Sequence, residues 1–204
     1  MTNLLVIRSS ATGAASVSNA LIDGFLADAK AAAADISVND RNLDTNPIDH
    51  IRAETLAGIG RPAPETEAAK PIRELSDALI AEVKAADVIV IGAPMYNFSL
   101  ATTLRSWFDH VLRAGATFQY TENGPEGFLG DKRVIIVATR AGAYSEGEAA
   151  AMDFQIPYLR QLLAFVGITN VDVVLVEKLA FGEEAASASI AAGKNELSKL
   201  ATSL

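Results

Sequence analysis

The chain has 204 residues, of which 50% are hydrophobic, and this is enough for a single domain (residues 1–204) with its own core. It contains no cysteine, which excludes disulfides, thiolate metal sites and a cysteine nucleophile, and which is typical of a reducing compartment such as the cytoplasm. The formal charge of −8, with 17 Lys and Arg against 25 Asp and Glu and no basic patch, argues against nucleic-acid binding.

Apolar segments are short throughout the chain. The N-terminal one, Leu4–Ile7, is too short for a signal peptide, and none approaches the ~18 residues of a membrane-spanning helix, so we expect no membrane association. Apolar periodicity instead predicts alternating strands and helices. In chain order these are a strand at 4–7, a helix at about 17–34, a weak strand at 36–41, a helical piece near 51–58 within a long connection, a helix through 72–83, a strand at 88–91, a helix at 104–112, a strand at 134–138, a helix at about 148–166, a strand at 170–177 and a helix at 183–204.

The strand at 88–91 is the clearest of these elements. Val88–Ile91 is continuously apolar and β-branched, as expected of a parallel strand that is covered on both faces. Gly92, Ala93 and Pro94 follow it. Because proline lacks an amide hydrogen and restricts the residue before it, we expect the chain to leave the sheet at this point.

Five strands that alternate with helices predict right-handed βαβ units. The fold is therefore expected to be α/β, with a five-stranded parallel sheet and helices on both faces. Alternation alone does not give the strand order, for which we take 2-1-3-4-5. Ligands of such sheets bind beyond the carboxyl ends of the strands, where the strand order reverses. Polar or aromatic residues follow three of the strands, at 9–18, 95–98 and 139–144. In this order the three ends are neighbours, so they could form one site.

The first of these ends suits a phosphate group. Ser16 and Ser18 place hydroxyls at the start of a helix, where free amides and the helix dipole favour an anion. The same serines could instead be simple helix caps. Only one glycine, Gly13, lies in the loop, so the glycine patterns of a tightly held dinucleotide or a P-loop nucleotidase are absent.

The other two ends suit a planar ring. Met95, Tyr96, Asn97 and Phe98 combine a thioether, two aromatic faces and an amide that could read a polar edge, although they could also be core packing. Arg140 could pair with an anionic ring, or be an ordinary surface arginine. A mononucleotide with a large flat ring fits all three ends, and flavin mononucleotide (FMN) binds at this place in sheets of this order.

The sequence contains no evident catalytic constellation. His110 lies among Trp107, Phe108 and Val111 on a helix and is expected to be packed or solvated, not catalytic. The common motifs of zinc, calcium and serine-hydrolase sites are absent. We therefore predict no catalytic side chain and no metal site, which is consistent with a flavin because the flavin itself supplies the hydride and electron chemistry.

Two blocks of sequence resemble a known family. The residues Pro94–Phe98 and the downstream block Phe118–Gly127, which reads FQYTENGPEG, are similar to FMN-dependent NADH:azoreductases. The early serines and Gly167–Thr169 extend this similarity over nearly the whole chain. The resemblance implies a flavodoxin-like fold, one FMN per subunit and a homodimer with active sites at its interface. It also implies a ping-pong reaction, in which NADH reduces the flavin and an azo compound or quinone then takes two electrons.

The resemblance also assigns roles to individual residues. It implies that the phosphate is held by Ser10, Ser16, Val17 and Ser18. The isoalloxazine ring would be lined by Met95, Tyr96, Asn97 and Phe98. The polar edge of that ring would be held by Thr139, Arg140, Ala141 and Gly142. Phe118 and Tyr120 would belong to a mobile aromatic segment over the substrate. The family usually reads Ser-Arg-Gly-Gly at the third place. If Ala141 must adopt a positive φ or let the flavin approach its backbone closely, weaker FMN retention follows.

Two other interpretations stay open at this point. A flavodoxin-like electron carrier that depends on a partner reductase would suit the acidic charge, although a carrier would not need the aromatic segment. Alternatively, the fold has lost its flavin. No motif determines the natural electron acceptor or the choice between NADH and NADPH.

Overall fold

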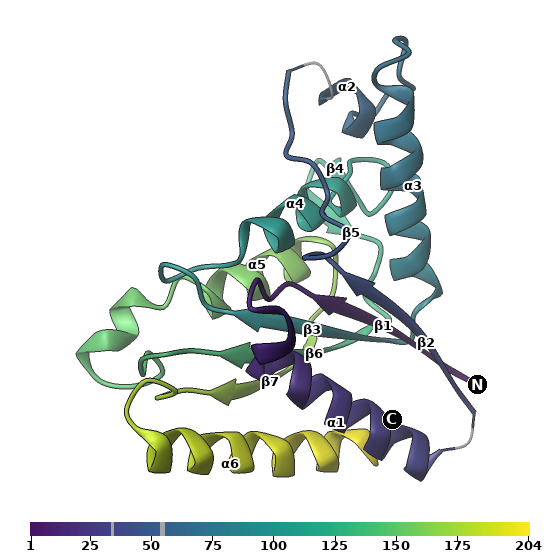
Figure 1. The fold of residues 1–204 in the computed structure, drawn as a ribbon. Coiled ribbons are helices and arrows are strands. Elements are labelled where there is room, and N and C mark those ends of the chain that lie inside the picture. Colours follow the sequence, from purple (N-terminus) through teal and green to yellow (C-terminus); the bar gives the residue numbers. More distant parts are fainter. Residues whose placement is uncertain (34, 54–55) are drawn as a thin grey trace.

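A computed structural model describes residues 1–33, 35–53 and 56–204. Five parallel strands form one sheet: β1 (Thr2–Arg8), β2 (Ile36–Asn42), β3 (Val88–Pro94), β6 (Arg133–Thr139) and β7 (Asn170–Val176). Their order is β2-β1-β3-β6-β7 (Figure 1). This is the predicted order 2-1-3-4-5, because β4 and β5 lie outside this sheet. The prediction of a five-stranded parallel α/β fold is confirmed.

Helices cover both faces of the sheet, as predicted. The helices α1 (Val17–Ala32) and α6 (Glu183–Ala201) lie on one face, and α3 (Lys70–Ala85), α4 (Thr102–Val111) and α5 (Ile156–Phe165) lie on the other (Figure 1). Alternate side chains of β1 enter the two cores: Leu4 packs with α1 and α6, and Leu5 packs on the opposite face. Continuous apolar runs such as Val88–Ile91 are required because each central strand is buried on both sides.

The end of β3 agrees with the prediction. The strand continues beyond the apolar run Val88–Ile91 and ends at Pro94, which lies opposite Thr139. The amide of Met95 donates to the Thr139 carbonyl (2.9 Å), so the amide position of Pro94 faces the other neighbour, β1. The last paired residue of β1, Arg8, lies opposite Gly92. Pro94 therefore costs the sheet no hydrogen bond.

The predicted helix over 148–166 is also wrong, because two helical segments replace it. A 3₁₀ turn at Glu148–Met152 is followed by three non-helical residues before α5 begins. The reason is Pro157, which is tolerated in the first turn of a helix but would clash with the carbonyl of residue 153 inside a continuous one. The Asp153 carboxylate caps the new start, accepting from the amides of Gln155 (2.9 Å) and Ile156 (3.1 Å).

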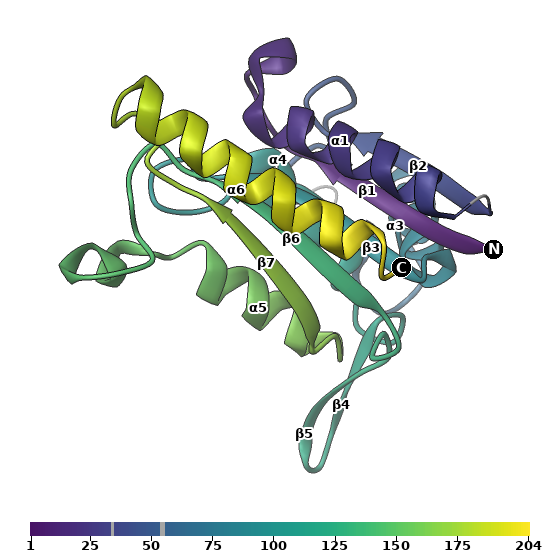
Figure 2. The same ribbon diagram turned by 90° about the horizontal axis from the view of Figure 1, so that it is seen from below.

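The long segment before β6 forms a hairpin of β4 (Phe118–Thr121) and β5 (Gly124–Gly127). Figure 2 shows it at the end of the sheet where β6 and β7 begin. The short helix α2 (Leu56–Ile59) overlaps the piece predicted at 51–58, whose residues 54 and 55, like residue 34 of the first predicted helix, lie outside the described residues. No helix in the described part of the chain is long and apolar enough to cross a membrane.

Candidate cofactor site at the carboxyl ends of the strands

A cavity of about 230 Å³ lies beyond the carboxyl ends of β1, β3 and β6. All three strand ends that the sequence singled out contribute to its wall, together with one residue that follows β7. The lining residues are Ser10, Thr12, Ala15, Ser16, Val17, Pro94, Met95, Tyr96, Thr139, Arg140, Ala141 and Leu179. The fold therefore brings the three ends into one place, as the strand order predicts.

The start of α1 forms one end of this cavity. Ser16 caps the helix, because its Oγ accepts from the amide of Asn19 (3.1 Å). Its Oγ also lies 3.1 Å from that of Ser18, which is 1% exposed and lies behind the cavity wall. The first amides of α1, beginning with Val17, have no acceptor within the helix and can bind an anion. Capping and anion binding are thus compatible here, since they use different donors.

The residues after β3 form a strained turn. The backbones of Tyr96 and Ser99 exchange two hydrogen bonds of 3.1 Å, and the residues between them, Asn97 and Phe98, have φ of 47° and 70°. Two successive left-handed residues are typical of a type I′ turn, in which asparagine is common. For phenylalanine such a backbone costs about 1–3 kcal/mol and is found mainly where the surrounding structure holds it for a function.

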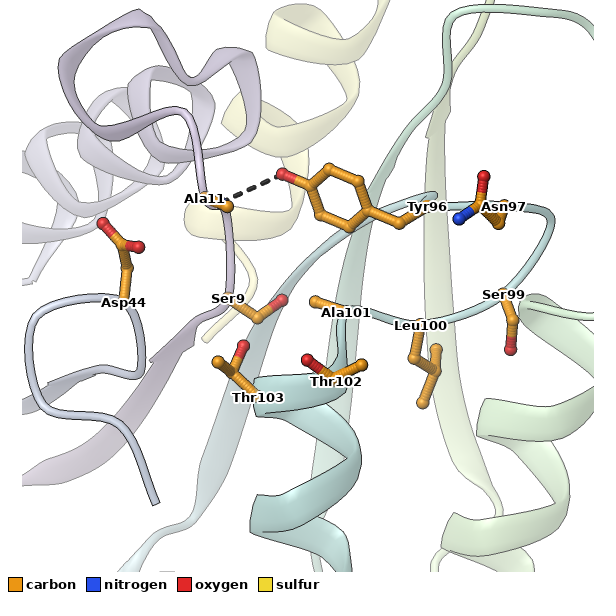
Figure 3. Close-up of a pocket in the computed structure, with 10 residues that line it drawn as sticks. All are labelled: Ser9, Ala11, Asp44, Tyr96, Asn97, Ser99, Leu100, Ala101, Thr102 and Thr103. Carbon is orange, nitrogen blue, oxygen red and sulfur yellow. Dashed lines mark hydrogen bonds between the residues drawn. The ribbon is translucent and has the colours of Figure 1, made fainter. Parts of the chain in front are cut away.

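The ring of Tyr96 separates this cavity from a second one of about 440 Å³. Figure 3 shows the second cavity, lined by Ser9, Ala11, Asp44, Tyr96, Asn97, Ser99, Leu100, Ala101, Thr102 and Thr103. The Tyr96 hydroxyl accepts from the amide of Ala11 (3.0 Å), so the side chain connects the loops after β3 and β1. Asn97 lines the second cavity, not the first.

The third strand end contains Ala141 and Gly142. Ala141 does not have a positive φ; among the described non-glycine residues only Asn97, Phe98 and Lys178 do. The premise of backbone strain at Ala141 is therefore wrong, and alanine fits this backbone. Gly142 lies outside the cavity lining, and a Cβ there would meet the Tyr144 ring at 2.8 Å.

The ring of Tyr144 packs edge-on against that of Phe98, with 5.8 Å between centroids. Phe98 is 42% exposed and is not part of the lining of the first cavity. The two rings connect the turn after β3 to the loop after β6. They leave an aromatic face open beside the cavity.

The Arg140 side chain is fully buried and held by three acceptors. Its Nε donates to Gln155 Oε1 (3.1 Å), one terminal nitrogen to Glu177 Oε1 (2.9 Å) and the other to Asp153 Oδ2 (2.8 Å). With 0% exposure, the guanidinium is neither a surface group nor free to pair with a ligand in the cavity. It joins the loop after β6 to β7 and to the segment before α5.

Glu177 follows β7 and is the buried acceptor of this network. Burial by itself would raise the pKa of its carboxyl group. Hydrogen bonds from the Ser145 hydroxyl, the Tyr144 amide and the Arg140 guanidinium outweigh burial, so the pKa is lowered below its ordinary value. The carboxylate is thus ionised and paired at neutral pH.

The hairpin residues lie far from this cavity within one chain. Phe118 is buried against Phe165, at the end of α5, with 4.5 Å between ring centroids, and Tyr120 is 73% exposed. Both are at the end of the sheet where β6 and β7 begin, opposite the cavity (Figure 2). A single chain therefore does not bring them together with the other predicted site residues.

The remaining titratable candidate, His110, is 2% exposed, so of the two expected alternatives, packed or solvated, it is packed. Its Nε2 donates to the Asp49 carbonyl (3.4 Å), and burial lowers its pKa. Among the described residues, no group of three or more His, Asp or Glu side chains could hold a metal ion.

Apart from Thr12, Ala15 and Pro94, which adjoin predicted site residues, four residues of this region were missed from the sequence: Leu179 in the cavity wall, and Asp153, Gln155 and Glu177 around Arg140. A signal existed for two of the segments. Glu177 is a charge placed directly after a buried strand, and Pro157 marks the helix break that frees Asp153 and Gln155.

Comparison with known proteins identifies the family. A family model described as having a flavodoxin-like fold matches residues 2–201. The chain belongs to this family. It is 52% identical over 201 residues to an FMN-dependent NADH:quinone oxidoreductase of Hyphomonas neptunium, covering 98% of this chain and 96% of that protein. A second protein of that name, from Herminiimonas arsenicoxydans, is 43% identical and covers 98% of both chains.

Among solved structures, an azoreductase from Bacillus anthracis strain Sterne superposes with a TM-score of 0.92. It is 30% identical in sequence, and the alignment covers 100% of both chains. The family resemblance predicted from Pro94–Phe98 and the FQYTENGPEG block is thus confirmed.

Proposed function

We propose that this protein is an FMN-dependent oxidoreductase that uses NADH to reduce quinones and azo compounds. The observation that carries the proposal is the cavity in which the ends of β1, β3 and β6 meet, with a helix start at one side and a strained aromatic turn at the other. The names of the relatives, FMN-dependent NADH:quinone oxidoreductase and azoreductase, support the same chemistry.

The residues of the cavity fit the parts of FMN. Val17 and the hydroxyls of Ser10 and Ser16 would hold the phosphate at the start of α1. Met95 and Tyr96 would lie against the ring, and Thr139 and Ala141 would lie at its polar edge. Asn97 would reach the ring from the rim between the two cavities. Ser18, Phe98 and Gly142 would act from behind or beside the cavity, and the Arg140 side chain, which is buried, would support the loop whose backbone lines it.

FMN, when bound, supplies hydride and electron transfer, so this chain needs to bind, orient and enclose the reactants. We further propose a ping-pong order, in which the oxidised nicotinamide leaves before the acceptor enters. A shared place for both reactants beside the exposed aromatic face of Phe98 and Tyr144 would impose that order. No side chain is assigned as a proton donor.

We also propose that the protein is a homodimer. The exposed aromatic side chains occur at both ends of the molecule: Phe98 (42%) and Phe154 (62%) near the cavity, and Tyr120 (73%) and Phe128 (42%) at the hairpin. A second copy could place its hairpin over the cavity of the first, which would bring Phe118 and Tyr120 near the substrate. The cytoplasmic location expected from the composition stays a prediction.

The experiment is to add FMN to the purified protein, remove the excess and record the visible spectrum anaerobically before and after NADH. Rapid bleaching of the flavin band supports the oxidoreductase. A bound flavin that stays oxidised with NADH and NADPH would favour an electron carrier, and no bound flavin would overturn the proposal. In steady-state kinetics with varied NADH and quinone, parallel double-reciprocal lines support the ping-pong order, and intersecting lines contradict it.

A further inference from the structure

The three residues before α5 contact both segments that would face the flavin ring. The amide of Phe154 donates to the Phe98 carbonyl (3.2 Å) in the strained turn, and Gln155 Nε2 donates to the Ala93 carbonyl (2.8 Å) near the end of β3. The neighbouring Asp153 and the other side of the Gln155 amide group accept from Arg140. This segment therefore connects the turn after β3 with the loop after β6.

Arg140 is the centre of that connection. Each of its three nitrogens donates to a different residue, and these residues come from β7 and from the segment before α5. The planar, forked guanidinium reaches three such acceptors because its donors lie on three separate nitrogens, whereas the three donors of a lysine ammonium all lie on one nitrogen at the end of a flexible stem. Gln155 is 0% exposed; its Oε1 accepts from Arg140 Nε, and its Nε2 donates to the Ala93 carbonyl on β3.

Stability alone is a poor explanation for this arrangement. Replacing a buried ion network by well-packed apolar residues is often neutral or stabilising, since desolvation offsets much of the attraction between the charges. What such a network provides is one defined geometry. Binding sites need their contact groups held within about 0.5 Å, and neighbouring buried hydrogen bonds are the usual means.

We infer that Arg140 and Gln155 are positioning residues, which set the spacing between the turn at 96–99 and the loop at 139–142 so that a planar flavin ring fits between them. The inference rests on the proposed function, and it replaces direct pairing between Arg140 and the flavin. The Arg140 guanidinium acts through Gln155 and Asp153, and because it has 0% exposure it does not itself contact cofactor or substrate.

Three variants test this inference. Arg140→Lys keeps the charge but loses the fork, and Gln155→Met keeps both ion pairs but cuts the connection to β3. Arg133→Lys is the matched control, because Arg133 lies at the opposite end of the same strand and pairs with Asp172 (2.8 Å). The FMN dissociation constant is measured by quenching of flavin fluorescence, at a temperature at which circular dichroism shows each apo variant to be folded.

We expect the first two variants to bind FMN about tenfold more weakly, as is typical when a residue that orients a binding group is lost. The absorption bands of their bound flavin should also shift, because the ring lies in altered surroundings. Arg133→Lys should match the wild type in both. A purely structural role would lower the melting temperature without changing the affinity or the spectrum of the folded protein.

Unchanged affinity and spectrum in folded Gln155→Met would overturn the inference even if Arg140→Lys did not fold. A wild type that binds no FMN would overturn this inference together with the proposed function. A wild type that binds FMN, beside variants that bind it equally well, would overturn the inference alone.

Discussion

The strand β6 carries an arginine at each end, and the two are held very differently. Arg133 begins the strand and pairs with Asp172 on β7, with side-chain exposures of 22% and 36%. Arg140 follows the strand, has 0% exposure, and pairs with Asp153 (14%) and Glu177 (10%). The amino end of the sheet thus has an ordinary ion pair, whereas the carboxyl end has a saturated buried network next to the cavity.

The comparison shows that the buried charged groups of these two ion pairs lie at the carboxyl end of the sheet. At the amino end, water solvates much of each charge, so the pair contributes little and tolerates loose geometry. At the carboxyl end, desolvated charges must be fully hydrogen-bonded, and this fixes the loops around them. The strained turn at Asn97 and Phe98 lies at the same end, which is the end where parallel sheets bind ligands.

The largest expected effect comes from removing each arginine in turn. Arg140→Met should lower the free energy of unfolding of the apo protein by about 3–5 kcal/mol, because two buried carboxylates lose their cation. Arg133→Met should cost at most about 1 kcal/mol, because its pair is partly solvated. Urea denaturation of both variants checks this, and similar losses at the two ends would contradict the comparison.

On acidification, the buried groups His110 and Glu177 should change the free energy of unfolding in two different pH ranges. Burial lowers the pKa of His110 below its ordinary value of 6.5. As pH falls, the imidazole is therefore protonated in the unfolded chain at a higher pH than in the folded protein. The free energy of unfolding should therefore fall by up to about 1.4 kcal/mol per pH unit as pH drops below 6.5. Urea titrations from pH 7.5 to 5.5 should show this fall in the wild type and a smaller one in His110→Gln.

The Glu177 contribution has a different pH window. Its pKa is lowered from an ordinary value of 4.5, so its stabilising effect is fully present above pH 4.5 and is lost as pH falls through the folded-state pKa. Glu177→Gln should accordingly reduce the pH dependence of stability only below about pH 4.5. A change in the slope between pH 7.5 and 5.5 in this variant would count against the assignment.

A smaller effect is expected at Asn97, in the strained turn at the carboxyl end. Asn97→Ala should weaken FMN binding about fivefold, the equivalent of one hydrogen bond of about 1 kcal/mol. The free energy of unfolding should fall by no more than about 1 kcal/mol, since alanine fits a positive φ less well than asparagine. Fluorescence titration and urea denaturation measure the two quantities, and unchanged FMN affinity would remove Asn97 from the site.

The smallest effect is expected at Ala141. Because its φ is not positive, Ala141→Gly relieves no backbone strain and should leave FMN affinity unchanged. The substitution should lower the free energy of unfolding by about 0.5–1 kcal/mol, because glycine has more freedom in the unfolded chain. Tighter FMN binding by this variant, in a fluorescence titration, would show that the flavin approaches the backbone there closely.

Sequence patterns predicted the sheet well and its margins poorly. Apolar runs such as Val88–Ile91 identify buried strands because a strand covered on both faces must be apolar throughout. Pro94 predicted where β3 ends, but the sequence could not show which neighbouring strand its amide position faces, and this decides whether the proline costs the sheet a hydrogen bond. In the predicted helix over 148–166, Pro157 indicated that the helix is interrupted. The helical spacing of apolar residues on both sides of Pro157 obscured this signal.

The sequence predicted the three polar strand ends, because short apolar runs that stop at polar residues mark buried strands and their ends. The strand order 2-1-3-4-5 is one of several that right-handed crossovers allow, and the packing of the strands decided it. The sequence could not determine the partners of Arg140. The nearest of them is 13 residues away and the farthest 37, and these side chains meet only once β6, β7 and α5 are packed together. Tertiary structure likewise placed Phe118 and Tyr120 at the opposite end of the sheet, because the hairpin is anchored on the end of α5, which runs back from the cavity.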